Sequence, residues 1–436
     1  MKDYPQEFID LLSPVSPQSF FDQYWEKQYL HTTGRQANRF EEFFSLRDID
    51  RWCMTTRSGD RDSILLTTGP GGQQRKFRPR DVAVDTLYEA FNDGQSIVLN
   101  HLNDSWLPIA PFVQMLRSVF CADVGVNVYL TPRNAQTFPV HVDDHDVFIL
   151  QIHGEKVWKL HELKMLTVDR LPLKGLLNTT ADWGKKNRVH TPQQAELTLR
   201  PGDLLFVPRG MPHCAIAQDT SSLHITVSIV PLYWLDFFKI ALEQATITCP
   251  ELRRTLPPNL LYDPKSVETM RSQWRKVFEE FSREMTFEDT LDVLRRSRLR
   301  AQGFARDGHF AHLERAVDVQ SSSMIERRPG VDCVVESYEP HDSATIRFCD
   351  RSVRGKRRIL QVFEFIRDNE RFRVSELPRL DAAGQIVMVR RLIKEGLLRF
   401  AEDAQPSSQV EEEALINEGY LLQPAAVEPQ KEASPA

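Results

Sequence analysis

The sequence has no long apolar run. No stretch of about 18 apolar residues occurs, and the opening Met1-Lys-Asp-Tyr-Pro-Gln-Glu7 lacks the apolar core of a signal peptide. Cysteine is also scarce, because the six residues are scattered and form no Cys-x-x-Cys pair. This usage favours reduced thiols. We therefore expect a soluble, cytoplasmic protein.

The chain also lacks an excess of positive charge. Its formal net charge is −6, which argues against a general polyanion binder, although a local patch can differ. The 436 residues, 41% of them hydrophobic, suffice for two or three structural units with apolar cores.

A short metal-binding pattern occurs at His141-Val-Asp143. If this tripeptide lies in a strand, His141 and Asp143 share one face and Val142 points the other way. A third ligand, His213, lies far along the chain, as in a barrel where late strands lie beside early ones. Two imidazoles and a carboxylate form the facial triad that binds non-haem Fe(II), although zinc accepts the same ligands.

His-x-Asp alone is a weak signal. The alternative is that His141 and His213 are core residues whose ring nitrogens form hydrogen bonds within the protein and bind no metal. The segment before His213 strengthens it, since Gly202-Asp-Leu-Leu-Phe-Val-Pro-Arg-Gly-Met-Pro-His213 reads as a turn, a buried strand and a second turn. We expect a hairpin-type turn at Gly202 and a bend at Pro208 and Gly210. This spacing is typical of the cupin superfamily.

Lys156 is a candidate anchor for an anionic co-substrate. Gly154 is predicted to be the tip of a hairpin, so that Lys156 and Trp158 share a face of the returning strand. A buried ammonium is unfavourable unless paired, and a bound carboxylate would pair it. A solvated surface lysine is the alternative, and spacing alone does not decide between the two.

Several segments together resemble the JmjC-type ribosomal oxygenases, which are Fe(II)- and 2-oxoglutarate-dependent protein hydroxylases. The similarity is strongest from Phe20 to Ser228, and it rests on these motifs: Asn127-Val-Tyr-Leu-Thr-Pro-Arg-Asn-Ala-Gln136, His141-Val-Asp-Asp144, Phe148-Ile-Leu-Gln151, Gly154-Glu-Lys-Val-Trp158, and Pro201-Gly-Asp-Leu-Leu205 through His213.

The resemblance implies a role for each matched residue. His141, Asp143 and His213 would bind Fe(II), Lys156 would bind the distal carboxylate of 2-oxoglutarate, and Asn127 would line the same site. Tyr129 and Ser228 correspond to pocket positions near co-substrate and substrate. His145 departs from the family pattern, in which an apolar or aromatic residue is usual, so its role as pocket wall, substrate contact or extra ligand stays open.

By the same resemblance, the function is hydroxylation of a protein side chain with O2, on a histidine or arginine of a ribosomal protein. Three alternatives stay open: a metal-binding cupin enzyme that does not use 2-oxoglutarate, a hydroxylase of another peptide, and a histone-type lysine demethylase. Asp143 disfavours the last, since glutamate is common among demethylases. A winged-helix regulator with a degenerate barrel is a further class, disfavoured by the intact triad.

The predicted fold class is α+β, with a double-stranded β-helix core of the cupin type. Ser16 can cap a helix whose aromatic residues enter the core, namely Phe20, Phe21, Tyr24 and Trp25. Further along the chain, Gly69 to Arg80 is predicted to be an exposed loop, and Asp85 to Phe91 is predicted to be a helix. A polar insertion at 162–194 is a candidate substrate loop. The expected strands are Ser96–Leu99, Val126–Leu130, Val147–Ile152, Lys156–Leu160, Leu197–Leu199, Leu204–Val207 and Leu223–Ile229.

After Pro231 the pattern becomes helical, from Trp234 to Leu242, from Ser266 to Glu284, and from a capping box at Thr286 onward. In the family such a segment dimerises the protein, so the resemblance implies a homodimer. Strand character returns at 331–346, and 356–400 reads helix, strand, helix, strand, as in a winged helix.

Residues 356–400 carry eleven Lys or Arg against six Asp or Glu, which allows weak RNA contact, although a solvated basic face is the favoured explanation. We therefore expect a catalytic domain at 1–230, a helical domain at 231–330, a winged-helix-like domain at 331–400, and an acidic, partly disordered tail at 401–436.

Overall fold

The computed structural model describes residues 4–34, 36–56, 63–69, 72–162, 192–302 and 308–401. The insertion predicted at 162–194 and the tail at 401–436 lie almost wholly outside the described residues. The chain divides into two compact units. The first comprises the described residues within Met1–Asp307, Pro329–Val334 and Arg347–Ser352, and the second those within Gly308–Arg328, Val335–Ile346 and Val353–Ala436.

The strands within these ranges are all antiparallel where their pairing is recorded. Their bounds are β1 Leu30–Thr32, β2 Ile64–Thr67, β3 Gln74–Phe77, β4 Ser96–Leu99, β5 Asp123–Thr131, β6 Asp146–His153, β7 Lys156–His161, β8 Gln193–Leu199, β9 Leu204–Val207, β10 His213–Ala217, β11 Ser222–Val230, β12 Met324–Arg327, β13 Cys333–Tyr338, β14 Ser343–Phe348, β15 Arg351–Lys356, β16 Arg371–Arg373 and β17 Leu398–Phe400.

The α-helices of the same ranges are α1 Gln6–Leu12, α2 Pro17–Gln23, α3 Leu46–Thr55, α4 Val84–Asn92, α5 Ala110–Phe120, α7 Trp234–Thr248, α8 Pro264–Glu284, α9 Phe287–Gln302, α10 His309–Arg315, α11 Leu360–Asp368 and α12 Ala382–Glu395. No helix of the described chain is long and apolar enough to cross a membrane.

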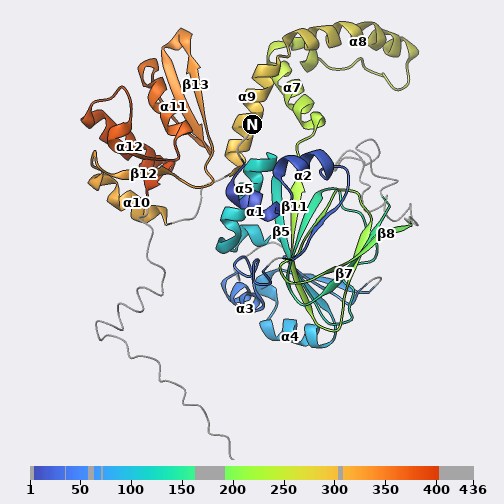
Figure 1. Cartoon of the computed structure of the whole chain (residues 1–436). Helices are drawn as coiled ribbons and strands as arrows, with labels where there is room; N and C mark the ends of the chain where they lie inside the picture. Colours follow the sequence, from blue (N-terminus) through green and yellow to red (C-terminus); the bar gives the residue numbers. More distant parts are fainter. Residues whose placement is uncertain are drawn as a thin grey trace, which may run out of the picture. The chain divides into compact units, whose positions relative to one another are not determined.

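Two facing sheets form the barrel of the first unit (Figure 1). The larger has the order β1-β9-β6-β11-β5-β4-β2-β3, and the smaller has the order β10-β7-β8. Between β6 and β11 the chain crosses repeatedly from one sheet to the other, as in a double-stranded β-helix. The predicted cupin-type core is therefore confirmed.

The larger sheet is buried on both faces, which explains the continuous apolar run in β6. Phe148 and Leu150 point outward and join a core with residues of α1, α2, α3 and α5. Val147 and Ile149 point inward and pack with Trp158 and Leu160 of β7. Because neighbouring residues of a strand point to opposite faces, one short segment supplies both cores.

The predicted N-terminal helix forms as α2, and the Ser16 hydroxyl accepts the Ser19 N–H at 3.1 Å. Phe20 is fully buried, while Phe21, Tyr24 and Trp25 pack against the core half-buried. The loop predicted at Gly69 to Arg80 is wrong in part, because residues 74–77 form the edge strand β3. The first three side chains of β3 are polar and exposed, so the sequence shows no alternation of apolar and polar residues there.

Two predicted hairpins are also wrong. Gly154 and Gly202 do form turns, with φ of +66° and +88°. However, Gly154 joins β6 of the large sheet to β7 of the small one, and Gly202 joins β8 of the small sheet to β9 of the large one. A turn residue reports a local bend and not which strands pair afterward. Lys156 consequently reaches the barrel interior from the sheet opposite β6.

Gly154→Ala is expected to destabilise the protein by more than about 2 kcal/mol, because an added Cβ would lie 1.8 Å from the Ser221 carbonyl oxygen in a left-handed conformation. Gly94→Ala is the matched control: its φ is +80°, but no heavy atom lies within 4 Å of the added Cβ. It should cost only about 1 kcal/mol. Urea unfolding of both variants measures the difference, and equal losses would contradict the steric explanation.

The second unit contains helix and strand in the predicted order at its C-terminal end. α11, β16, α12 and β17 follow one another, and β12 pairs with both β16 and β17. Asp381 caps α12 by accepting the Gly384 N–H at 2.8 Å, and Gly396 ends the helix with φ of +90°. A further sheet has the order β13-β14-β15.

Candidate metal centre and anion pocket

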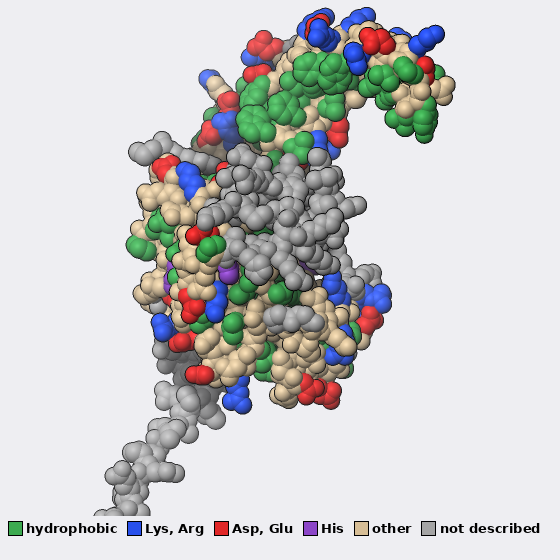
Figure 2. Space-filling model, turned by 90° about the vertical axis from the view of Figure 1, so that its right-hand side faces the viewer, with side chains coloured by type: hydrophobic (Ala, Val, Ile, Leu, Met, Phe, Trp, Pro, Cys, Tyr) green, Lys and Arg blue, Asp and Glu red, His purple; other side chains and the backbone are tan. Residues whose placement is uncertain are grey.

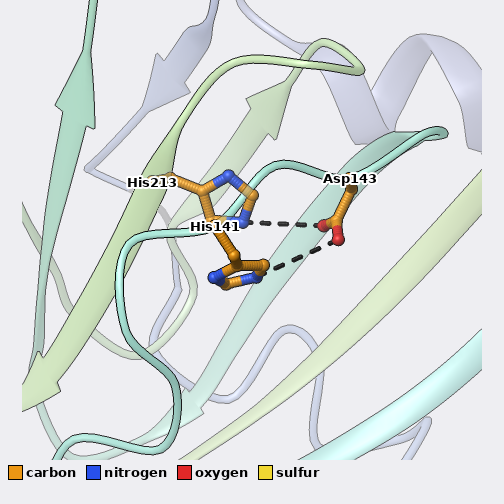
Figure 3. A group of neighbouring side chains, drawn as sticks. All are labelled: His141, Asp143 and His213. Carbon is orange, nitrogen blue, oxygen red and sulfur yellow. Dashed lines mark ion pairs between the residues drawn. The ribbon is translucent and has the colours of Figure 1, made fainter. Parts of the chain in front are cut away.

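The predicted metal ligands come together in the barrel of the first unit. One possible ligand atom from each of His141, Asp143 and His213 lies within 4.8 Å of the others. The His213 Nε2 is 3.6 Å from Asp143 Oδ2, and the His141 Nε2 is 3.9 Å from Asp143 Oδ1 (Figure 3). The side chains converge on one point, so a single cation could contact all three.

Both imidazoles are oriented by backbone carbonyls two residues earlier in the chain. The His141 Nδ1 lies 2.9 Å from the Pro139 carbonyl oxygen, and the His213 Nδ1 lies 2.8 Å from that of Met211. A carbonyl only accepts hydrogen bonds, so each Nδ1 carries the proton and each Nε2 keeps its lone pair. Metal-binding histidines use this arrangement, so the donor set fits a divalent cation.

The predicted strand through His141 and Asp143 is wrong. His141 forms only an isolated antiparallel bridge with His213, and Asp143 lies in an irregular segment before β6. The His141 N–H donates to the His213 carbonyl at 3.1 Å, and the His213 N–H donates back at 2.9 Å. Backbone pairing across 72 residues therefore brings the two histidines together, and strand alternation has no part in it.

Charge in the site suits a cation. Burial alone would raise the pKa of Asp143, but His141, His213 and His145 together hold that pKa below its usual value. Burial, reinforced by His141, lowers the pKa of His213 to about 4. At neutral pH the site therefore offers a carboxylate and a neutral His213. His145 lies beside this site, with its Nδ1 3.0 Å from Asp144 Oδ1.

Lys156 is buried, with 1% of its surface exposed. Its Nζ donates to the Thr131 hydroxyl at 2.8 Å, and in the described part of the chain no carboxylate forms an ion pair with it. Burial lowers the pKa of Lys156 to about 7. The solvated-surface alternative is therefore excluded, and among the described residues the ammonium has no counter-ion.

The triad and Lys156 line one pocket, which lies between the two sheets. The family resemblance indicated Tyr129 among its walls, and strand alternation placed Trp158 on the face of Lys156, but the sequence did not indicate Thr137 and Phe138 in the loop after β5. The lining residues are Tyr129, Thr137, Phe138, His141, Asp143, Val147, Ile149, Lys156, Trp158, His213, Ala215, His224 and Thr226.

His224 on β11 is a further wall residue of the pocket. Its ring stacks on Tyr129 at a centroid distance of 4.8 Å and an interplanar angle of 5°. Burial, and then the nearby Lys156, lowers its pKa well below the usual value. Its buried Nδ1 has no hydrogen-bond partner among the described residues. His224 is thus a neutral polar wall beside the cationic Lys156.

The remaining predicted pocket residues differ in their positions. Tyr129 lines the pocket, and burial with the nearby Asp143 raises its pKa, so the phenol is protonated at neutral pH. Asn127 lies behind it, hydrogen-bonded to Tyr129, and its Oδ1 accepts the His101 N–H at 3.1 Å. Ser228 is on the inward face of β11 but beyond the lining residues, and it donates to the Gly125 carbonyl at 3.1 Å.

Comparison with known proteins identifies the domain around this pocket. Residues 105–237 match the family model of the JmjC domain. The chain is 32% identical over 254 residues to the bifunctional lysine-specific demethylase and histidyl-hydroxylase NO66 of Dictyostelium discoideum, covering 57% of this chain and 48% of the relative. It is 27% identical over 325 residues to human ribosomal oxygenase 1, covering 72% and 46%. The chain thus spans about half the length of these two relatives.

Solved structures share the fold. YcfD of Escherichia coli superimposes with a TM-score of 0.52 at 15% identity, covering 89% of this chain and 98% of YcfD. Its complex with cobalt and 2-oxoglutarate has a TM-score of 0.50 at 14% identity, covering 89% and 99%. At such low identity the likeness shows the fold alone.

Proposed function

This chain belongs to the JmjC ribosomal oxygenase family, and on that premise we propose that it is an Fe(II)- and 2-oxoglutarate-dependent oxygenase that hydroxylates a protein side chain. One observation carries the proposal: a converging His-Asp-His set lines the same pocket as a buried lysine that has no counter-ion within the described ranges. The human relative's name, and the YcfD complex with cobalt and 2-oxoglutarate, support a ribosomal protein substrate and this co-substrate.

In this proposal His141, Asp143 and His213 hold Fe(II) through two Nε2 atoms and a carboxylate oxygen. Asp143 leaves the filled site with a net charge of +1, which attracts an anionic chelating co-substrate. When bound, Fe(II) with 2-oxoglutarate and O2 supplies the oxidation, in which one oxygen atom enters the substrate and the other enters succinate as CO2 leaves.

The protein's own groups position the reactants. The Lys156 ammonium pairs with the distal carboxylate of 2-oxoglutarate, and Thr131 orients that ammonium. The protonated Tyr129 can donate a hydrogen bond, with Asn127 holding its hydroxyl. Val147, Ile149 and Trp158 form apolar walls that keep water from the reacting atoms. Ser228 would act only at the edge of this pocket.

Mass spectrometry tests the reaction class. The full chain, Fe(II) and 2-oxoglutarate are incubated with purified ribosomal proteins, and we expect one peptide to gain the mass of one oxygen atom on histidine or arginine. The name of the Dictyostelium relative also includes a lysine-specific demethylase, so a methylated lysine peptide is assayed in parallel. Loss of a methyl group without any oxygen gain would replace the hydroxylase proposal by demethylation. Metal binding without 2-oxoglutarate turnover would favour another cupin enzyme.

We further propose that the helical region dimerises two copies of the chain. α8 buries none of its residues, and Val267, Trp274 and Phe278 are exposed at helical spacing. α7 exposes Trp234, Phe238 and Leu242 in the same manner. Figure 2 shows hydrophobic side chains gathered along these helices. Apolar surface of this extent marks an interaction site, and a second copy offers the same self-complementary face.

Trp274→Glu is expected to convert a dimer into a monomer, because a charge buried in an apolar interface is strongly unfavourable. Sedimentation equilibrium measures the change in mass. Gln273→Glu is the control, since it adds the same charge to an exposed neighbour on α8. A wild-type protein that stays monomeric at high concentration, or a dimeric Trp274→Glu variant, would contradict the proposed interface.

For the C-terminal region we propose a winged-helix-like domain at 331–400, supported by the order α11, β16, α12, β17. Its exposed Lys356, Arg357 and Arg358 are candidates for weak RNA contact. Filter binding at low salt tests this, and RNA retention unchanged by Arg358→Glu would argue against it. We also propose a cytoplasmic location, which is supported by six scattered cysteines without a Cys-x-x-Cys pair and is tested by cell fractionation.

A further inference from the structure

A buried ion pair lies beside the segments that carry the metal ligands. The Arg209 guanidinium donates through one terminal nitrogen to Asp146 Oδ2 at 2.7 Å. The side chain of Asp146 is fully buried and that of Arg209 is 8% exposed. The other terminal nitrogen of Arg209 pairs with Glu26, and its guanidinium carbon lies 5.5 Å from the centre of the Tyr233 ring. The guanidinium is therefore held from three directions.

The pair joins two segments at the point where their strand pairing stops. β6 and β9 pair as far as Val147 and Val207. The residue that follows β9 is Pro208, which has no N–H to donate. Beyond it, Asp146 Oδ1 accepts the backbone N–H of Arg209 at 3.0 Å. The carboxylate thus replaces the missing strand contact and also holds the arginine side chain.

The two residues of this ion pair lie close in the sequence to two of the proposed metal ligands. Asp146 follows Asp143 by three residues, and Arg209 precedes His213 by four. Between the ion pair and the His141–His213 bridge, the Gly210 N–H donates to the Asp143 carbonyl at 2.7 Å. The irregular segment of Asp143 is therefore attached to the His213 segment at both of its ends and at its centre.

We propose that Asp146 and Arg209 are positioning residues of the metal centre, which fix the distance between the Asp143 carboxylate and the His213 imidazole. This inference rests on the proposed function, because it takes the triad as the metal site. A buried ion pair is a weak source of stability, since desolvation offsets most of the attraction. Its retention at this junction fits a positional role, because a triad in an irregular segment needs external support to stay preorganised.

The test uses Co(II) alone as the probe, with affinity and visible absorption as readouts that need no catalysis. The double variant Asp146→Asn, Arg209→Gln removes both charges together, so that no unpaired buried charge remains, while Asn can still accept the Arg209-position N–H. We expect Co(II) affinity to fall by about 10-fold and the absorption band to change, as for other outer partners of metal ligands. The matched control is Glu326→Gln, Arg399→Gln, which removes a comparable half-buried pair of 2.6 Å in the second unit and should leave Co(II) binding unchanged.

Wild-type Co(II) affinity and spectrum in the folded double variant would overturn the proposal and leave the pair a purely structural element. If the double variant fails to fold, Arg209→Lys is tested instead, because lysine keeps the positive charge but lacks the two terminal nitrogens that pair with Asp146 and Glu26. Weakened Co(II) binding by this variant would support the positioning role, and wild-type binding would overturn it. Failure of the proposed function looks different, since the wild-type protein itself would then bind no Co(II) or His141→Ala would bind it equally well.

Discussion

His141→Ala and Asp143→Ala should each reduce bound iron and 2-oxoglutarate decarboxylation to background. Each change removes one of three ligands, and Asp143→Ala also removes the only negative charge of the triad. The fold should persist, because the two sheets are held by apolar cores such as Val147 and Phe148 and not by the site. Metal content by mass spectrometry and succinate release measure the two effects.

Matched controls separate loss of a ligand from loss of a residue type. His153→Ala and Asp219→Ala change the same residue types at exposed positions of the barrel, and both should keep wild-type iron content and turnover. Circular dichroism of all four variants checks the fold. If the His141 and Asp143 variants kept wild-type iron stoichiometry and turnover, the triad and the proposed function would both be wrong.

Lys156→Met should abolish 2-oxoglutarate turnover while leaving iron bound. A methionine fills the space of the lysine stem but offers no charge to the distal carboxylate. Losing one partner of a buried charge pair costs about 2–5 kcal/mol, which is roughly 30-fold to several thousand-fold in affinity for 2-oxoglutarate. Lys159→Met is the control, since Lys159 points to the outer face of β7 beside Glu196. Full turnover in Lys156→Met would remove the anchor assignment.

The same variant should be more stable than the ligand-free wild-type protein at pH 7, by about 1–4 kcal/mol, because it removes a buried ammonium that no carboxylate in the described part of the chain pairs with. Burial lowers the pKa of Lys156 from 10.5 to about 7, so the unfolded chain binds more protons than the folded one between these values. Wild-type stability therefore rises relative to the variant as pH rises from 7 to 10.5. Urea unfolding across this range tests the trend, and an advantage of Lys156→Met that grew with pH would contradict it.

The sequence alone predicted the residues of the candidate site and the faces on which several of them lie. Alternation along β7 places Lys156 and Trp158 on one face, as predicted, although spacing alone did not show that this face lines the barrel interior. Local signals also predicted α2, α12 and its end at Gly396, because caps and left-handed turns depend on neighbouring residues.

Only the tertiary structure decided which segments meet. Nothing near Gly154 or Gly202 shows that the chain changes sheets there, since both a hairpin and a crossover begin with the same positive φ. The backbone bridge of His141 and His213 and the pairing of Asp146 with Arg209 join residues more than 60 positions apart. Such contacts depend on strand order and register across the whole barrel, and periodicity within a segment carries no information about them.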